Sequence, residues 1–315
     1  MAKLMSKKTR EIVKTTTVLI IIVLFIGFYI VYPLITVPKL VARPDKDKFD
    51  DPEFKYANDA SFFVDSGLLP DTFAIATDDN IRLAALYFRP DSNKFDSISG
   101  TVIMLHGDNS DRTSLISYIS PLLDTGLAMV IYDQRASGFS GGKYHAAGIY
   151  EADDLVQLIV DLNFKGMLFP PLTVVGFDLG ADAVIFASQK ENRIDGVVAI
   201  NPYLTSSRWI SSLVRAKNAL AIPLYKMVYF WWYQKLTGFP FDRTGVDDIQ
   251  PVETRTILIA GQSAFEEDEY LKLMEISPDA VTTVSRAPDS DKEKSRQMIL
   301  EYILYMAGIP TGTLK

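Results

Sequence analysis

The sequence predicts an α/β domain, in which helices cover both faces of a mostly parallel sheet, preceded by one transmembrane helix. Short apolar runs alternate with helical patterns from about residue 72 onward, which is typical of parallel strands joined by helices. Several of these runs are apolar at every position, as in strands buried on both faces. Near the N-terminus, no charged residue occurs between Lys14 and Lys39, which is enough chain to cross a bilayer as a helix.

Composition narrows the possible functions. Of the 315 residues, 48% are hydrophobic, so the chain can form one large domain with additional segments. The net charge of -7 argues against nucleic-acid binding, which needs a basic face. The absence of cysteine excludes disulfides, thiolate nucleophiles and cysteine-based metal sites. Only two histidines, His106 and His145, could serve as catalytic bases.

The first 60 residues are predicted to form three segments. Residues 1–14 are a basic flank, residues 15–37 a transmembrane helix, and residues 38–60 a charged tether that is too polar to bury much surface. Tyr29 and Tyr32 would lie near one membrane interface, where aromatic rings prefer to lie. A cleaved signal peptide is the alternative interpretation, but no small-x-small cleavage pattern follows the apolar stretch.

The orientation in the membrane is predicted from the flanks. Basic residues occur on both sides of the apolar stretch, so the positive-inside bias is slight. A short N-terminal flank followed by a long domain favours an N-terminus inside the cell. We therefore expect a single-pass protein of the cell membrane, with the domain at residues 61–315 on the periplasmic or extracellular side.

The predicted α/β domain begins with a β-hairpin. Residues 73–77 and 81–88 are strand-like, and the Asp78-Asp79-Asn80 sequence between them suits a turn. A buried strand at 101–105 then ends in His106-Gly107. The remaining pattern predicts helices at 112–123, 149–163 and 291–307, and strands at 127–132, 172–177, 196–200, 256–260 and 280–284.

Three turns at strand ends carry the functional signal. The sharpest is Gly176-x-Asp178-x-Gly180, between the strand at 172–177 and a helical pattern. The other two are Leu105-His106-Gly107 and Tyr132-Asp133-x-Arg135-x-x-Gly138-x-Ser140. In this order, on these elements, the turns resemble the motifs of α/β-hydrolases. The resemblance covers about residues 70–308 and is greatest to the membrane-anchored, serine-aminopeptidase-like branch.

This resemblance implies the α/β-hydrolase fold with a nucleophile at the elbow. The central residue of that turn, usually Ser, is pushed into the pocket, and here it is Asp178. The insert at about 203–252 interrupts the strand–helix alternation and carries all three tryptophans. It resembles the helical cap that covers hydrolase pockets, and its aromatic residues could alternatively touch lipid headgroups.

The other two positions of the catalytic triad are also altered. The acid of the family is expected about three residues after Gly261, where this chain has Ala264. The neighbouring run Glu266-Glu267-Asp268 is expected to be a solvated face. The histidine is expected after the strand at 280–284, yet no histidine follows His145. Because serine hydrolysis needs a nucleophile, a base and an orienting acid, the chain is expected to have lost that chemistry.

An Asp at the elbow leaves a second interpretation open. Haloalkane dehalogenases and epoxide hydrolases resemble this arrangement, in which an Asp attacks carbon and a His-activated water releases the ester. His106 belongs to a turn whose histidine is generally structural in the family. His145, after the Gly141-Gly142 pair, is the candidate for a displaced base. The alternative is therefore an active hydrolase that uses Asp178 as nucleophile and His145 as base.

The resemblance also places Asp108 and Leu179 at oxyanion-type loop positions. Asp108 would share the pocket with Asp178, and two carboxylates there would raise a pKa or recruit a cation such as Ca²⁺. They would also oppose a developing oxyanion. No ligand-spacing motif supports a metal, so neither a metal nor a cofactor is predicted. We expect a membrane-anchored protein that has lost hydrolase activity and acts by binding a small apolar ligand or a protein partner.

Overall fold

The computed structural model describes residues 7–41, 63–64, 67–108, 110–216, 223–240, 242–285 and 292–310. Within it, the chain divides into two compact units. One unit combines Met1–Val41 with Ile210–Pro240, and the other combines Ala42–Trp209 with Phe241–Lys315. Part of the predicted insert therefore belongs to the unit of the N-terminal helix and not to the unit that contains the sheet.

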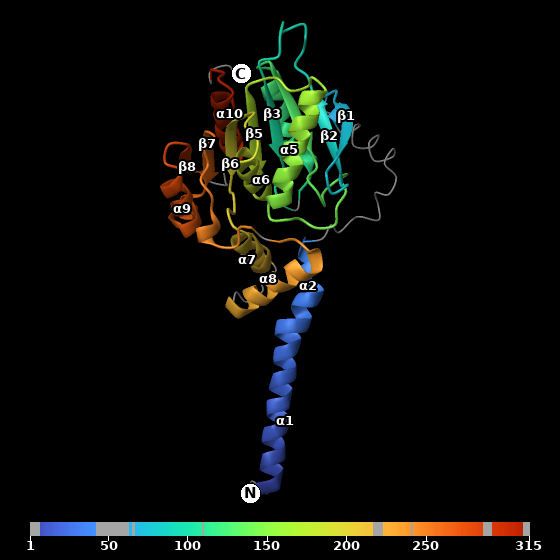
Figure 1. Cartoon of the computed structure of the whole chain (residues 1–315), viewed down its shortest axis with the longest axis vertical. Coiled ribbons are helices and arrows are strands. Elements are labelled where there is room, and N and C mark those ends of the chain that lie inside the picture. Colours follow the sequence, from blue (N-terminus) through green and yellow to red (C-terminus); the bar gives the residue numbers. More distant parts are fainter. Residues whose placement is uncertain are drawn as a thin grey trace. The chain divides into compact units, whose positions relative to one another are not determined.

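The larger unit is built on one eight-stranded sheet with the strand order β1-β2-β4-β3-β5-β6-β7-β8 (Figure 1). The pairs β1·β2 and β2·β4 are antiparallel, and the remaining neighbours are parallel, which confirms a mostly parallel sheet. The strands are β1 (Asp71–Ala76), β2 (Arg82–Phe88), β3 (Gly100–Leu105), β4 (Leu127–Tyr132), β5 (Leu172–Phe177), β6 (Ile194–Ile200), β7 (Thr256–Ala260) and β8 (Val281–Ser285).

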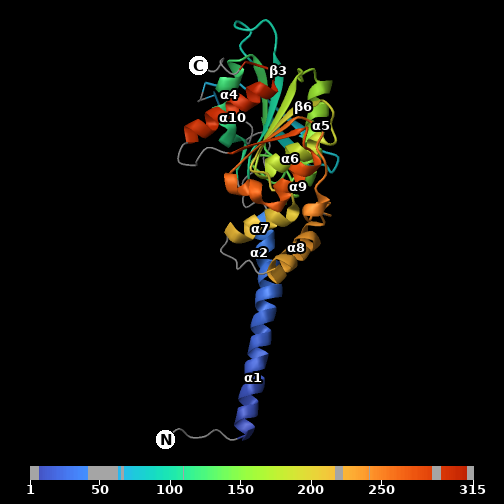
Figure 2. The same ribbon diagram turned by 90° about the vertical axis from the view of Figure 1, so that its left-hand side faces the viewer.

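Helices cover both faces of this sheet (Figures 1 and 2). On one face lie α5, α6 and α9, and on the other lie α4 and α10. Helix α9 was not predicted, because its acidic start was interpreted as a solvated run. The α-helices of this unit are α4 (Ile116–Leu123), α5 (Ile149–Phe164), α6 (Leu179–Ser188), α9 (Asp268–Ile276) and α10 (Lys292–Met306), and short 3-10 helices are η3 (Arg112–Leu115), η4 (Val246–Asp248) and η5 (Gln262–Glu266).

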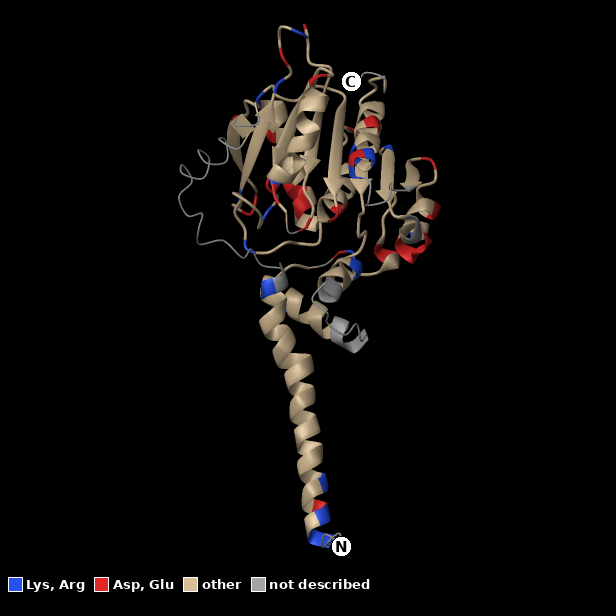
Figure 3. Ribbon diagram, turned by 180° about the vertical axis from the view of Figure 1, so that it is seen from behind, with Lys and Arg blue, Asp and Glu red and all other residues tan. Residues whose placement is uncertain are grey.

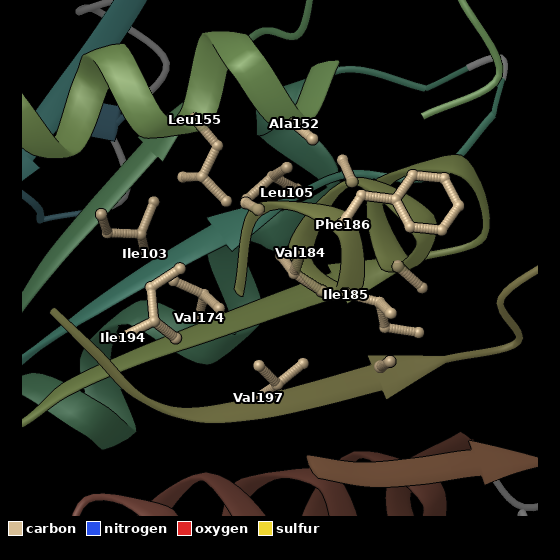
Figure 4. Close-up of a cluster of buried hydrophobic side chains, with 14 of the residues drawn as sticks. Ile103, Leu105, Ala152, Leu155, Val174, Val184, Ile185, Phe186, Ile194 and Val197 are labelled. Carbon is tan, nitrogen blue, oxygen red and sulfur yellow. The ribbon is translucent and has the colours of Figure 1, made fainter. Parts of the chain in front are cut away.

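The central strands are apolar throughout because both of their faces are buried. In β3, Ile103 and Leu105 pack into the cluster with α5 and α6, whereas Val102 and Met104 pack into the cluster with α4 and α10. Successive side chains of a strand point to opposite faces, so a continuous apolar run is what a sheet covered on both sides requires. Figure 4 shows the first of these clusters, in which Leu155 of α5 packs with β3 and β5.

A buried ion pair ties the edge hairpin to the middle of the sheet unit. Arg135, in the loop after β4, donates to Asp154 of α5 over 2.6 and 2.8 Å, and both side chains are almost fully buried. Arg135 also donates to Asp79, in the turn between β1 and β2, over 3.0 Å. Charges out of water need paired, hydrogen-bonded partners, and this guanidinium has two carboxylates. The loop after β4 is thereby held in one position.

The smaller unit contains a long N-terminal helix. It consists of α1 (Lys7–Ile26), a π-helical segment η1 (Gly27–Val31) and α2 (Tyr32–Val41). Among the described residues, one helix, Lys7–Lys39, is long and apolar enough to cross a membrane. Figure 3 shows its stretch without charged residues. The helix continues past residue 37 to Val41, so the first part of the predicted tether is helical, while residues 42–60 lie outside the described residues.

The predicted insert contains two α-helices, α7 (Ser206–Ala216) and α8 (Pro223–Thr237). Helix α8 belongs to the same compact unit as the N-terminal helix and packs beside α2. A side-chain hydrogen bond joins Thr36 of α2 to Tyr229 of α8. Two segments that are far apart in the sequence therefore form one small helical unit.

Gly176 provides a test of the strand-to-helix turn at Asp178. A Cβ atom on Gly176 would overlap the backbone of Gly180, which cannot move away as a flexible side chain could. We expect Gly176→Ala to lower the free energy of unfolding by about 2 kcal/mol or more, measured by urea denaturation of the full chain in detergent. Gly261→Ala is the matched control, because no atom lies within 4 Å of its added Cβ. Equal stability of the two variants would contradict the close approach.

Candidate functional site

The three turns singled out in the sequence meet at one edge of the sheet. Asp108 follows β3, Gly138 follows β4 and Asp178 follows β5. These three strands are neighbours and run parallel, so their carboxyl ends lie side by side. Ligands of open α/β sheets bind at this edge. The predicted common location of the three turns is therefore confirmed.

Asp178 sits on a strained turn, as expected for the nucleophile position of a hydrolase elbow. Its backbone has φ 49° and ψ −113°, a conformation that L-residues rarely adopt. The two glycines of the motif permit this turn: a Cβ on Gly180 would lie 2.6 Å from the His106 carbonyl oxygen, and one on Gly176 would meet Gly180. The chain turns from β5 into α6 within one residue, and the Asp178 side chain is pushed out at the sheet edge.

The Asp178 carboxylate lies against the loop that follows β3. A Cβ on Gly107 would overlap Oδ2 of Asp178 in its present position, so a larger residue there would require this carboxylate to move. The preceding His106 is buried, and both of its ring nitrogens are used. Its Nδ1 lies 2.9 Å from the Gly107 carbonyl oxygen, and its Nε2 accepts from the Gln134 N–H over 3.1 Å. Burial lowers the pKa of His106, which favours the neutral ring. His106 is therefore a support of the loop.

Asp108 is a second carboxylate at this edge of the sheet, in the loop after β3. Its Oδ2 accepts from the Tyr203 hydroxyl over 2.9 Å. Burial raises the pKa of Asp108, and the hydrogen bond from the Tyr203 hydroxyl offsets this only in part. In the fold, the N–H of the residue after the elbow, here Leu179, is one of the two oxyanion donors.

Asp182 is a buried carboxylate that sequence analysis missed. It accepts from the Leu204 N–H over 2.6 Å and thereby holds the start of the insert on α6. Burial raises its pKa well above the ordinary value, and the Asp108 carboxylate raises it further, whereas the Tyr203 N–H and Arg208 lower it. No pattern in the sequence distinguished Asp182 from an ordinary helix residue, because its role depends on a contact with a distant loop.

His145, the predicted displaced base, has an acid partner on one side. Its Nδ1 lies 3.5 Å from Oε1 of Glu151, and its Nε2 lies 3.4 Å from the Ser137 hydroxyl. Glu151 is fully buried and accepts from the N–H groups of Ala146 and Gly148. Burial alone would raise the pKa of Glu151, but the nearby His145 ring, the Arg135 charge and the hydrogen bond from the Ala146 N–H lower it. Nε2 of His145 thus faces Ser137, and Glu151 can orient the ring.

The remaining residues of the second motif hold the loop after β4 in shape. Asp133 is buried and accepts from the N–H groups of Arg112 and Phe139 over 2.9 and 2.8 Å. Gly138 has φ 45°, and any side chain there would overlap the Asp133 carboxylate. Ser140 accepts from the Ala84 N–H over 2.9 Å. These residues position the loop and leave its chemistry to Ser137 and His145.

The structure describes one of the two segments in which the acid and the histidine of a triad were expected. Ala264 lies on η5 after β7 and packs against the apolar core, so it offers no acid. The acidic run Glu266-Glu267-Asp268 was expected to be a solvated face. In the structure, Glu267 pairs with Arg208 over 2.8 Å, and Asp268 begins α9. The segment after β8 where a histidine was expected, residues 286–291, lies outside the described residues.

A cavity of about 420 Å³ lies near the elbow, between α4 and α10. Phe177, the residue before Asp178, contributes to its wall. Apolar and polar groups both line it, which suits a small ligand with one or two polar atoms. Among the described residues, no group of three His, Asp or Glu has the arrangement of a metal site. The lining residues include Ser117, Tyr118, Phe177, Arg296 and Ile299.

Comparison of the sequence with known proteins gives one partial match. No family model matches the chain. A stretch of 141 residues, 44% of the chain, is 30% identical to the uncharacterized protein YqkD of Bacillus subtilis (strain 168). The match covers 46% of that protein, so the chain spans about half the length of this curated relative.

Comparison of the structure identifies the fold. The chain is similar to the esterase Pf2001 of Pyrococcus furiosus, with 23% identity, a TM-score of 0.58 and coverage of 77% of this chain and 92% of the esterase. It is also similar to a 2,6-dihydroxy-pseudo-oxynicotine hydrolase, with 14% identity, a TM-score of 0.56 and coverage of 81% of this chain and 71% of the hydrolase. A third similar structure is an esterase of Exiguobacterium antarcticum, with 13% identity, a TM-score of 0.52 and coverage of 74% of this chain and 99% of the esterase. The chain has the α/β-hydrolase fold, as its three turns indicated.

The raised pKa of Asp182 predicts a pH-dependent stability. A carboxyl whose pKa is raised by folding stabilises the fold in acid and loses that contribution as the pH rises from about 4, the unfolded value, through the folded pKa. Asp182→Asn keeps an acceptor for the Leu204 N–H but carries no charge. Relative to this variant, we expect the wild-type chain to lose up to about 1.4 kcal/mol per pH unit in that window, measured by denaturation at several pH values.

Asp248→Asn is the control with the opposite sign. Hydrogen bonds from the Gly245 N–H and from Thr244 lower the pKa of Asp248. The wild-type chain should therefore gain stability over this variant as the pH rises through the folded pKa of Asp248. If Asp182→Asn and Asp248→Asn shift stability in the same direction with pH, the assigned environment of Asp182 is wrong.

Proposed function

We propose that this chain is a membrane-anchored protein whose α/β-hydrolase-fold domain acts by binding and not by hydrolysis. The observation that carries the proposal is that a carboxylate, Asp178, stands on the strained turn after β5, where a serine hydrolase needs a hydroxyl. A second carboxylate, Asp108, follows β3 at the same edge of the sheet and accepts from the Tyr203 hydroxyl over 2.9 Å. Neither carboxylate can stabilise the negative oxygen of a tetrahedral intermediate.

The elbow itself supports the same conclusion. Asp178 has no hydroxyl, and its carboxylate lies beside the same loop as Asp108. Two carboxylates repel a developing oxyanion and favour a neutral or positively charged group instead. The chain also has no histidine after His145, so the usual base is missing. The positions at which the family would carry nucleophile, acid and base are thus all altered in the sequence.

The cavity beside Phe177 supports a small apolar ligand as the bound species. Its volume of about 420 Å³ falls within the range of small-molecule sites. Polar and charged side chains of its wall, including Ser117, Glu293 and Arg296, would select a ligand that also carries a complementary polar group. A segment of a protein partner could present the same chemistry, and it is the second kind of ligand that we propose.

A working hydrolase is the second candidate function. In it, the Asp178 carboxylate attacks a substrate carbon and displaces a halide ion or opens an epoxide ring, which gives an ester; His145 then takes a proton from the water that cleaves this ester. The Glu151 carboxylate, buried behind His145, favours this candidate because it would orient the ring and stabilise its charged form. Against it stands the contact of Nε2 with Ser137, since the base would need Nε2 for the water.

The anchor is proposed to be the helix Lys7–Lys39. A helix of this length and hydropathy satisfies its own backbone hydrogen bonds, which a bilayer requires. We propose one crossing with the N-terminus inside the cell, which would put the α/β domain on the periplasmic or extracellular side. The five basic residues of the N-terminal flank favour this orientation.

Fractionation tests the anchor. The full chain should sediment with membranes, resist high salt and alkaline carbonate, and become soluble when residues 1–40 are removed, because the apolar stretch then no longer contributes lipid burial. The readout is an immunoblot of the soluble and membrane fractions. Recovery of the intact chain in the soluble fraction would exclude an anchor.

Activity assays test the choice between binding and hydrolysis. We expect no turnover of simple esters and no labelling by a fluorophosphonate. Asp178→Ser alone should not create normal activity, because each missing triad member typically costs several powers of ten in rate. Asp178→Asn should leave the free energy of unfolding unchanged or higher, since it removes a charge beside the Gly107 loop.

The second candidate predicts the opposite pattern. Turnover of a halide, epoxide or ester should then be measurable, and Asp178→Asn should abolish it. His145→Ala should trap the covalent ester, which intact-mass spectrometry detects as a mass increase. Glu151→Gln should reduce the rate of release without preventing formation of the ester. This pattern, starting from real activity in the wild-type chain, would overturn the binding proposal.

A further inference from the structure

Helix α8 has two faces of opposite exposure. Tyr229 and Tyr233, four residues apart, are 3% and 1% exposed, so one side of the helix is buried. Met227 and Trp231, also four residues apart, are 62% and 53% exposed. Residues at i and i+4 lie on the same side of a helix, so these pairs define two stripes. The exposed stripe continues to Lys235, which is exposed as well.

The buried stripe of α8 packs on the end of the long N-terminal helix. The Tyr229 hydroxyl is hydrogen-bonded to Thr36, and Pro33 and Val37 of α2 are buried. By contrast, none of the residues of α1 is buried. Helix α8 also contacts the π-helical segment η1, but it packs chiefly beside α2, so it is held near the C-terminal end of the N-terminal helix (Figures 1 and 2).

That level corresponds to the surface of a bilayer crossed by the N-terminal helix. The charge-free stretch begins at Thr15, and Thr36 lies 21 positions later. At 1.5 Å per helical residue, the two positions are about 30 Å apart, which is the thickness of the hydrocarbon core. With Thr15 at one interface, Thr36 and its partner Tyr229 lie at the other.

We propose that α8 is an interfacial helix, whose exposed stripe of Met227, Trp231 and Lys235 docks on the lipid surface of the membrane that the N-terminal helix crosses. This inference rests on the proposed anchor. Met227 and Trp231 would enter the boundary between headgroups and acyl chains, which is where tryptophan prefers to lie. Lys235 would reach the phosphates of anionic lipids, as lysines at membrane surfaces do.

Lipid is the occupant that the chemistry of this stripe fits. Trp231 also packs edge-on against Trp232, with ring centroids 4.6 Å apart, so the helix offers a continuous aromatic surface. In a helix that lies in the plane of the interface, Met227 and Trp231 reach the boundary between headgroups and acyl chains, and the long side chain of Lys235 reaches the phosphates. The other lysine at this level, Lys39 of α2, is exposed too and adds to the attraction for anionic headgroups.

Single-cysteine labelling of the full chain tests the proposal, because the chain has no cysteine of its own. An environment-sensitive fluorophore is attached at Met227→Cys, and the chain is reconstituted in vesicles of phosphatidylcholine and phosphatidylglycerol. The label should emit at shorter wavelength, be quenched by lipids with a nitroxide near the headgroup, and be protected from aqueous iodide. Phe164→Cys, on α5 and 89% exposed, is the water-facing control. Its label should emit at longer wavelength, be quenched by aqueous iodide and not be quenched by the nitroxide lipids.

Ile22→Cys separates the failure of this inference from failure of the anchor. Protection of that label together with iodide quenching at Met227→Cys overturns the inference and leaves the anchor intact. Iodide quenching at Ile22→Cys overturns both. Protection of Met227→Cys from lipid and aqueous quenchers alike means that protein covers the stripe, which also overturns the inference.

A charge introduced into the stripe gives a second readout. Trp231→Glu should move the Met227→Cys label back toward water, with longer-wavelength emission and loss of lipid quenching, because a carboxylate opposes entry into an anionic interface. Tyr305→Glu, at a side chain that is also 53% exposed but lies on α10, should leave the label unchanged. An unchanged label in Trp231→Glu would also overturn the inference.

Discussion

The close approach between the turn after β5 and the loop after β3 is the constraint on which the site depends. Gly180 passes so near the His106 carbonyl that a methyl group would not fit, and the Asp178 carboxylate lies directly beside Gly107. Backbone segments packed this closely have few allowed conformations, and the one adopted here gives Asp178 a positive φ. The rest of the sheet edge is arranged around that contact, including the buried His106 and the loop that Gln134 holds.

On this scaffold, the sheet edge carries two carboxylates. Asp178 stands on the strained turn before α6, and Asp108 follows β3 and accepts from the Tyr203 hydroxyl. In an esterase, the start of the corresponding helix would meet a transient negative oxygen. Carboxylates at this edge oppose such an oxygen, which is why we propose recognition of a ligand and not stabilisation of a transition state.

Patterns within single segments allowed the sheet, its helices and the strained elbow to be predicted, because buried strands such as β3 and the glycines around Asp178 show their environment locally. Contacts between distant segments could not be predicted. The partners of His145, the tie of Asp182 to Leu204 and the pairing of Glu267 with Arg208 depend on loops brought together by the fold. Helix α9 was missed because its first residues are acidic. Its apolar side consists of few residues, of which Tyr270 and Leu273 are buried.

The hydrogen bond between Thr36 and Tyr229 has a consequence for the order of assembly, because it joins residues 193 positions apart. During synthesis the N-terminal helix is complete before β1 to β6, and all six of these strands precede α8 in the chain. The smaller unit therefore closes late, as contacts of high sequence separation do. Until then, Pro33 and Val37 have no partner from α8, so delayed synthesis or folding of the intervening domain prolongs their exposure to other apolar surfaces.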